Sequence, residues 1–146
     1  MHDTVALVSL GGRDPTKPAP RLARRNVRIE NYVDQWNALR EASVFITHQG
    51  LNSTHEAIFH QTPMISYPFL SDQPGLAKRC QELGLAVPLV EALRGPVGPD
   101  DVRSALARVA AQHDAMRARL AEARRWELET IRARQDVIAR IVALTR

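Results

Sequence analysis

Short apolar segments alternate with helix-like segments from the start of the chain to about residue 90. Each apolar segment ends at a glycine, a proline or a polar residue, which is typical of strands. We predict strands at 4–10, 26–33, 43–47, 64–67 and 86–90. The stretches between them predict helices at 36–42, 54–60 and 71–84. Strands that alternate with helices favour an α/β fold, in which a parallel sheet carries helices on both faces.

The last third of the chain has a different pattern, which indicates long helices. Pro99, Asp100 and Asp101 suit a first helical turn, because acidic groups favour the positive end of the helix dipole. One helical face is then marked by Val102, Leu106, Val109, His113, Met116 and Leu120. A further helical stretch carries Leu128, Ile131, Ile138, Ile141 and Val142. We therefore expect a domain over residues 1–98, and helices over 99–146 that pack on it or extend from it.

Composition fits an ordinary globular domain. Hydrophobic residues make up 45% and charged residues 25% of the 146 residues. No apolar run reaches the roughly 18 residues that a membrane helix needs, and the start of the chain lacks the pattern of a secretory signal. The single cysteine, Cys80, gives neither a disulfide framework nor metal-site spacing. We therefore expect a cytoplasmic protein without a membrane span.

The positive charge of the chain is concentrated near its C-terminus. The formal net charge is +4, and residues 94–146 hold 11 arginines against 7 acidic side chains. Residues 1–93 are balanced, with 9 basic and 9 acidic side chains. A basic helical tail is one form of nucleic-acid-binding surface, and it predicts strongly salt-dependent affinity. Acidic residues interspersed among the arginines favour a solvated helix face instead, so we expect no nucleic-acid partner.

Polar residues with binding chemistry gather in the turn that follows the third predicted strand. Ligands of parallel sheets bind beyond the carboxyl ends of the strands, where a helix N-terminus offers N–H groups to phosphate. Gly50 allows a close approach to the backbone, and His48, Asn52 and Ser53 offer hydrogen-bond donors to the same anion. Glu56 shares a helix face with Asn52 and Ser53, where its carboxylate suits the two hydroxyls of a ribose.

Asp72 and Gln73 lie on the next loop at a strand end, where they offer acceptors and donors for sugar hydroxyls. Two structural alternatives need no ligand. Ser53 and Glu56 have the spacing of a capping box, and Asp72 suits the N-cap of the following helix. The residues themselves leave both interpretations open.

Metal binding is the weaker interpretation of the histidines in this region. His55 and His60 are five residues apart and face different sides of a helix, and no cysteine or aspartate completes a set with His48. The chain also lacks the glycine patterns GxxxxGK and GxGxxG of phosphate-binding loops. We expect no metal and no cofactor.

Taken together, residues 26–84 resemble the C-terminal-domain signature of the UDP-glycosyltransferase family. The most informative run reads NVRIENYVDQWNALREASVFITHQGLNSTHEAIFHQTPMISYPFLSDQ. The family pattern contains Asn-Val, a Pro-Gln turn, a His-x-Gly-x-Asn-Ser-x-x-Glu block and a final Asp-Gln. The bacterial branch that glycosylates macrolides and other natural products is the most similar. The resemblance implies half of a GT-B fold: a Rossmann-like parallel sheet flanked by helices, incomplete at its N-terminus, with long C-terminal helices.

The resemblance also implies how the nucleotide would be held. Gln35 matches the glutamine of the base-binding segment, and Tyr32 lies near the position of the usual stacking tryptophan. His48 and Gly50 match residues that contact the pyrophosphate. The sequence departs from the pattern at Asp34, which replaces the usual proline.

Further matches concern the phosphates, the ribose and the sugar. Asn52 and Ser53 match phosphate contacts, and Glu56 matches the ribose-binding carboxylate. Asp72 and Gln73 match the pair that grips the donor sugar. There are departures here too: Gln49 stands where glycine or cysteine is common, and Leu76 stands where asparagine is frequent.

The implied activity is transfer of a hexose from a UDP- or TDP-sugar to a hydroxyl acceptor, by an inverting and metal-independent glycosyltransferase. In this family an N-terminal domain binds the acceptor and supplies a histidine base. None of the histidines in this chain matches that base, so we expect no catalytic residue here and no turnover by this chain alone. A second chain that supplies the acceptor domain is one expected partner.

A non-catalytic fragment, or a nucleotide-binding and oligomerisation module, is the alternative function. The family's first strand and helix of this domain have no counterpart in the sequence, which would leave apolar sheet surface exposed. Exposed sheet edges and apolar patches pair with other chains, so we also expect self-association, in which the C-terminal helices take part.

Overall fold

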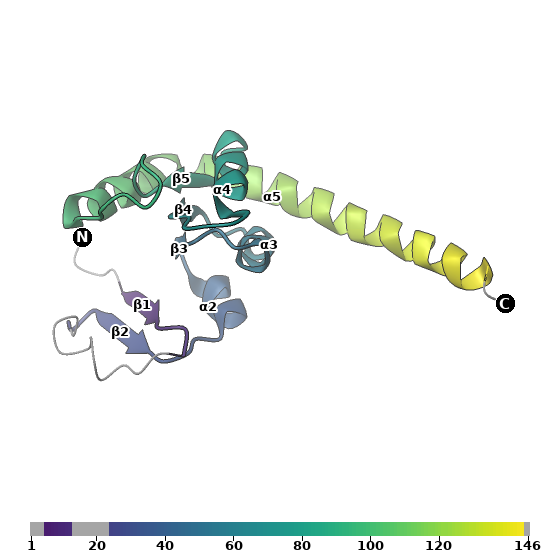
Figure 1. Ribbon diagram of the computed structural model, residues 1–146, viewed down its shortest axis with the longest axis horizontal. Coiled ribbons are helices and arrows are strands. Elements are labelled where there is room, and N and C mark those ends of the chain that lie inside the picture. Colours follow the sequence, from purple (N-terminus) through teal and green to yellow (C-terminus); the bar gives the residue numbers. More distant parts are fainter. Residues whose placement is uncertain (1–4, 13–23, 145–146) are drawn as a thin grey trace. The chain divides into compact units, whose positions relative to one another are not determined.

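The computed structural model describes residues 5–12 and 24–144 of the chain (Figure 1). The chain forms two compact units, Met1–Ala38 and Leu39–Arg146. The domain boundary expected at residue 98 stays a prediction.

The smaller unit contains two paired strands. Strand β1 (Ala6–Ser9) pairs in parallel with β2 (Val27–Glu30), so that Ala6 lies opposite Val27 and Ser9 opposite Glu30. Both predicted strands are therefore confirmed in shorter form, and residue 4 lies outside the described residues. Gly11 and Gly12 end β1 with φ of 62° and 86°, a left-handed conformation that glycine adopts without strain. Helix α2 (Gln35–Glu41) begins in this unit.

The larger unit is built on a parallel sheet. Its strands are β3 (Phe45–Thr47), β4 (Met64–Ser66) and β5 (Ala86–Pro88), hydrogen-bonded in that order. Helices α3 (Leu51–His60) and α4 (Gln73–Glu82) connect them. Pro74 lies in the first turn of α4, as predicted. The expected arrangement of a parallel sheet flanked by helices is confirmed.

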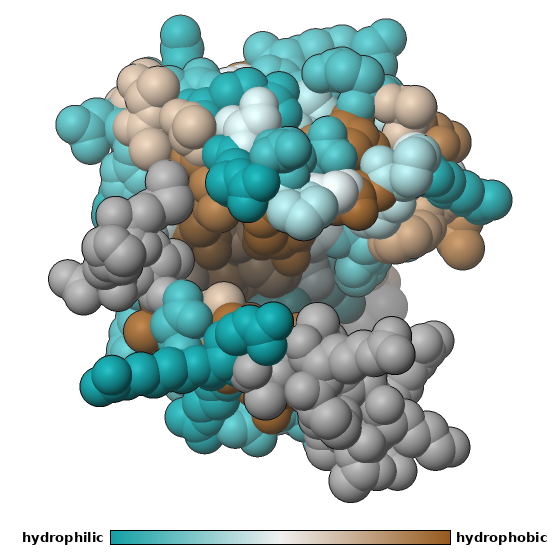
Figure 2. Space-filling view, turned by 90° about the vertical axis from the view of Figure 1, so that its left-hand side faces the viewer, coloured by the Kyte–Doolittle hydropathy of each residue, from teal (hydrophilic) through white to brown (hydrophobic). Residues whose placement is uncertain are grey.

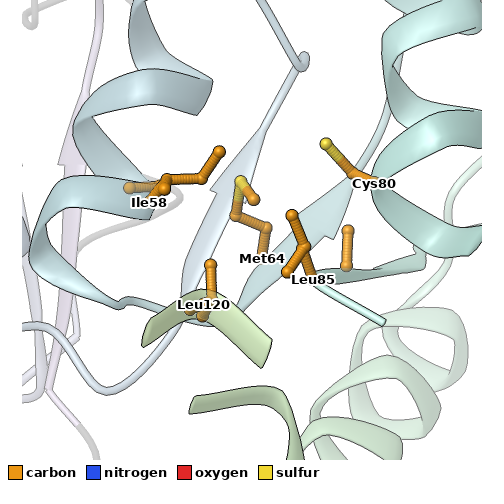
Figure 3. Close-up of a cluster of buried hydrophobic side chains, with 7 residues drawn as sticks. Ile58, Met64, Cys80, Leu85 and Leu120 are labelled. Carbon is orange, nitrogen blue, oxygen red and sulfur yellow. The ribbon is translucent and has the colours of Figure 1, made fainter. Parts of the chain in front are cut away.

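Both faces of this sheet are covered, because successive strand residues point to opposite sides. On one face Met64 packs with Ile58, Cys80, Leu85 and Leu120, which come from α3, α4, the residue before β5 and the last helix (Figure 3). On the other face Ile65 and Val87 pack with residues 105–116 of the last helix; the buried residues there are Ala105, Val109 and Met116. The sheet therefore carries a hydrophobic cluster on each of its faces.

The last helix, α5 (Pro99–Leu144), supplies residues to both clusters. The expectation of more than one helix after residue 98 is confirmed, because α5 consists of two helices joined across a kink at Gln112, where φ is −128° and ψ is 18°. Its first half packs on the sheet, whereas residues 131–144 are exposed along their whole length. Apolar side chains are exposed there as well: Ile131, Val137, Ile138, Ile141, Val142 and Leu144.

Hydrophobic residues reach the surface in other places too, and Figure 2 shows one face where they lie among hydrophilic ones. In the larger unit, Phe69 and Leu70 follow β4, and Leu93 and Val97 follow β5; all four are exposed. The two loops are joined by a hydrogen bond, in which the Tyr67 hydroxyl donates to the Gly95 carbonyl over 2.8 Å.

Among residues 5–12 and 24–144, the helices lack the combination of length and hydrophobicity that a membrane-spanning helix needs.

Candidate functional site

The turn between β3 and α3 leaves the N-terminus of α3 open. Gly50 is the N-cap residue, in an extended conformation, and as a glycine it has no side chain to cap the helix. The first bond of the helical pattern runs from the Thr54 N–H to the Gly50 carbonyl (2.9 Å), so the N–H groups of Leu51 and Asn52 lie at the N-terminal end of the helix, before this bond. A free helix end of this kind binds anions.

The structure corrects two expectations about this helix. It begins at Leu51 rather than at residue 54, because the chain turns into the helix directly after Gly50. The capping-box interpretation of Ser53 and Glu56 is therefore wrong, since Ser53 lies inside the helix and a capping box needs it at the N-cap.

His48 and Gly50 are brought together by the turn. A Cβ built on Gly50 would lie 2.6 Å from Nε2 of His48, so the exposed imidazole lies over the glycine. Glycine at position 50 makes room for this ring. The two residues that the sequence predicts to contact the pyrophosphate therefore lie next to each other, with the imidazole against the backbone of Gly50.

Asn52, Ser53 and Glu56 lie on one face of α3, at spacings of three and four residues. Asn52 is exposed, and Ser53 and Glu56 are half-buried. The structure therefore brings these three predicted residues together beside the free end of the helix.

The histidines of α3 take other roles. His55 Nδ1 lies 2.6 Å from Oε1 of Glu127, which links α3 to α5. His60 lies at the end of α3, where its ring meets that of Phe59 edge to face. Within the part of the chain that the structure describes, no cluster of histidine, cysteine and acidic residues is suited to a metal ion.

Asp72 and Gln73 lie at the same edge of the sheet as the turn. β3 and β4 are parallel neighbours, and their carboxyl ends are joined by a bond from the Tyr67 N–H to the Thr47 carbonyl (2.8 Å). Asp72 occupies the N-cap position of α4, but its carboxylate makes no capping bond and is exposed. The capping role considered for Asp72 is therefore wrong.

The side-chain oxygen of Gln73 is hydrogen-bonded to the loop that precedes α4. Its Oε1 accepts hydrogen bonds from the N–H groups of Phe69 (2.9 Å) and Leu70 (3.2 Å). The side-chain NH₂ group of Gln73 is consequently the part suited to a ligand.

Tyr32 and Gln35 belong to the smaller unit. Tyr32 is 79% exposed, and Gln35 is the first residue of α2. Asp34 starts this helix, because its carboxylate accepts bonds from the Asn37 N–H (3.1 Å) and the Asn37 side-chain amide (2.7 Å). These bonds, first from the backbone and then from the side chain, lower the pKa of Asp34. The replacement of the family's proline at 34 thus keeps a helix start before Gln35.

Comparison with known proteins decides the family. Residues 9–118 match the sequence model of a family described as UDP-glucoronosyl and UDP-glucosyl transferase. The chain belongs to this family. The resemblance inferred from residues 26–84 is thereby confirmed.

Relatives of this family are similar in sequence and fold. Zeaxanthin glucosyltransferase of Pantoea ananas is 37% identical over 78 residues, which cover 53% of this chain and 18% of that protein. The crystal structure of the glycotransferase of kitacinnamycin has a TM-score of 0.73 at 30% identity, over 83% of this chain and 30% of that one. The calicheamicin glycosyltransferase has a TM-score of 0.78 at 23% identity, over 98% of this chain and 44% of that one. The chain therefore spans less than half the length of each of these relatives.

The family pattern alone gave no sign that buried residues support the turn. Gln49 stood out only as a departure from the usual glycine or cysteine, and Thr54 did not stand out. In the structure both side chains are buried beneath the turn and bonded to each other. Cys80 lies in the same region, and burial, followed by the charge of Glu127, raises the pKa of its thiol to about 11.

Proposed function

We propose that this chain binds the nucleotide-sugar donor of a glycosyltransferase, with the diphosphate on the turn at 48–53. The observation that carries the proposal is the N-terminus of α3. Its N-cap residue, Gly50, has no capping side chain, and the His48 imidazole lies beside it. Several N–H groups and a helix dipole at one point favour a multiply charged anion. An imidazole N–H adds a further donor.

The ribose would bind to Glu56, about one turn into α3. The carboxylate lies on the same helix face as Asn52 and Ser53, which would contact the phosphates. An ionised carboxylate accepts two hydroxyl hydrogen bonds, and bonds to charged groups are stronger than neutral ones. Loss of the capping-box alternative supports this role.

The donor sugar would lie at Asp72 and Gln73, which follow the neighbouring strand. The Asp72 carboxylate makes no capping bond to α4, so it would accept hydrogen bonds from sugar hydroxyls, and the Gln73 NH₂ group would donate to them. By the family resemblance, the base of the nucleotide would be bound by the segment that contains Gln35, with Tyr32 near the stacking position.

The reaction we propose is a single displacement at the anomeric carbon of a hexose. The acceptor oxygen forms the new glycosidic bond as the bond to the diphosphate breaks, and a base takes the hydroxyl proton. Attack from the side opposite the leaving group inverts the anomeric configuration. The helix end and His48 would stabilise the departing diphosphate without a metal ion. The base would come from an acceptor domain in the complete enzyme.

Surface chemistry supports a partner for this chain. The tied loops after β4 and β5 expose Phe69, Leu70, Leu93 and Val97 at the carboxyl edge of the sheet, where an acceptor domain would meet the donor. The exposed apolar residues at 131–144 of α5 favour the second candidate, self-association as a nucleotide-binding module.

Calorimetric titration with UDP, UDP-glucose and TDP-glucose, with and without EDTA, tests the donor site. We expect saturable one-site binding that EDTA leaves unchanged, and no glycoside from a hydroxyl acceptor with this chain alone. A chain that binds none of the three nucleotides would overturn the donor proposal. Binding that EDTA abolishes would overturn only its metal independence.

A further inference from the structure

Gln49 occupies an unfavourable position for a glutamine. It lies between His48 and Gly50, has a left-handed backbone with φ of 64°, and is fully buried. A left-handed conformation strains residues other than glycine, and a buried amide loses its hydration. Such a residue persists where its surroundings hold it firmly, which is frequent at binding sites.

A relay of hydrogen bonds joins this side chain to the turn. The Gln49 Nε2 donates to the Thr54 hydroxyl (3.0 Å), and that hydroxyl donates to the Gly50 carbonyl (2.9 Å). The Gly50 carbonyl also accepts the Thr54 backbone N–H (2.9 Å). At the other end the Gln49 N–H donates to the Thr47 hydroxyl (3.1 Å). Gln49 is thus fixed both to the end of β3 and to the first turn of α3.

The relay holds the peptide group between Gly50 and Leu51. Because the C=O and N–H of a trans peptide are coplanar and opposed, a Gly50 carbonyl held toward Thr54 directs the Leu51 N–H out of the helix end. We propose that Gln49 is a positioning residue of the donor site, which acts through Thr54 to direct the Leu51 N–H at the diphosphate. This inference rests on the proposed function.

The stability of the fold does not explain why an amide side chain stands at position 49. Oε1 of Gln49 is buried and accepts no hydrogen bond among the described residues. The remaining neighbours of Nε2 are weak acceptors, the sulfurs of Met64 (3.2 Å) and Cys80 (3.5 Å). A methionine of similar length would fill the same space without a desolvated carbonyl. Methionine at position 49 should therefore keep the stability of the fold while removing the hydrogen bond that positions the turn.

The test compares Gln49→Met with Thr54→Val and their double variant. We expect Gln49→Met to keep the thermal midpoint of the wild type, to weaken UDP binding about fivefold, the factor for one neutral hydrogen bond, and to speed amide exchange at Thr54. Because both residues act in one relay, the double variant should lose no more affinity than Thr54→Val alone. Thr54→Ser, which keeps the hydroxyl, should bind UDP as the wild type does.

The outcomes separate this inference from the function on which it rests. A wild type that binds UDP and a Gln49→Met variant that binds it equally well would overturn the positioning role only. Additive losses in the double variant would overturn the relay through Thr54. A wild type that binds no UDP would overturn the donor site, and the positioning role with it.

Discussion

The imidazole of His48 lies over Gly50, so that a Cβ at position 50 would come 2.6 Å from Nε2. The backbone of Gly50 is extended, with φ of −67° and ψ of 149°, which any residue adopts. The glycine is therefore needed for the space that the ring occupies, and its conformational freedom is not needed here.

Gly50→Ala should displace the ring of His48 and weaken UDP binding about tenfold, the loss of one hydrogen bond to a charged group. The thermal midpoint should change little, because the ring is exposed and free to move away. Calorimetry and thermal unfolding measure the two effects. In a His48→Ala background the same substitution should have no further effect on binding.

Gly75→Ala is the matched control for this prediction. Gly75 lies in α4, and a Cβ there meets no atom within 4 Å. The variant should unfold at a slightly higher temperature, because alanine favours a helix by about 0.5–1 kcal/mol over glycine. UDP affinity should stay unchanged. Equal losses of affinity in both variants would contradict a specific role for position 50.

Glu56→Ala should weaken UDP binding by roughly 1.5–3 kcal/mol, because the ribose loses hydrogen bonds to a charged acceptor. Calorimetry with UDP and 2′-deoxy-UDP measures the effect: the wild type should prefer UDP, and the variant should bind both about equally. Glu82→Ala, which removes an exposed glutamate of α4, serves as the control and should retain the preference. Wild-type affinity in Glu56→Ala would show that this carboxylate does not contact the ribose.

Asp34 should make the start of α2 sensitive to acid. Hydrogen bonds from Asn37 lower its pKa below the ordinary 3.8 in the folded state. A depressed folded pKa means that this stabilisation is fully present above 3.8 and is lost as the pH falls through the lowered value. The stability difference between wild type and Asp34→Ala should therefore shrink in that window. Thermal unfolding across the acid range measures it.

Asp34→Asn is the control for this titration, since asparagine caps helices about as well and does not ionise in this range. Its stability relative to Asp34→Ala should not vary with pH through the window. A constant difference between wild type and Asp34→Ala down to the lowest pH would contradict the role of the carboxylate.

The exposed end of α5 should drive self-association. Ile138 and Ile141 are 59% and 57% exposed, so lysine at both positions should leave the thermal midpoint nearly unchanged. Sedimentation velocity should show a concentration-dependent increase in mass for the wild type and a monomer for the double variant. A wild type that sediments as a monomer at all concentrations would contradict this prediction. Val102→Lys, on the packed half of α5, should instead lower the thermal midpoint.

The sequence by itself determined the elements, their parallel arrangement and the family. Alternating apolar segments and helical periodicity predicted β3, β4 and β5 to within two residues at each end, because these patterns are local. Residues 26–84 carried the family resemblance, and the block from His48 to Glu56 is one of its motifs.

Only the tertiary structure decided how those residues are held. Helix α3 begins at Leu51, three residues earlier than expected, so Ser53 lies inside the helix and not at its cap. Gln49 reaches Met64 and Cys80, which are 15 and 31 residues away in the chain, and no local pattern encodes contacts of that separation. α5 likewise joins both faces of the sheet through Met116 and Leu120. The physical reason is that burial depends on which segments pack together, whereas periodicity records only which side of each segment is apolar.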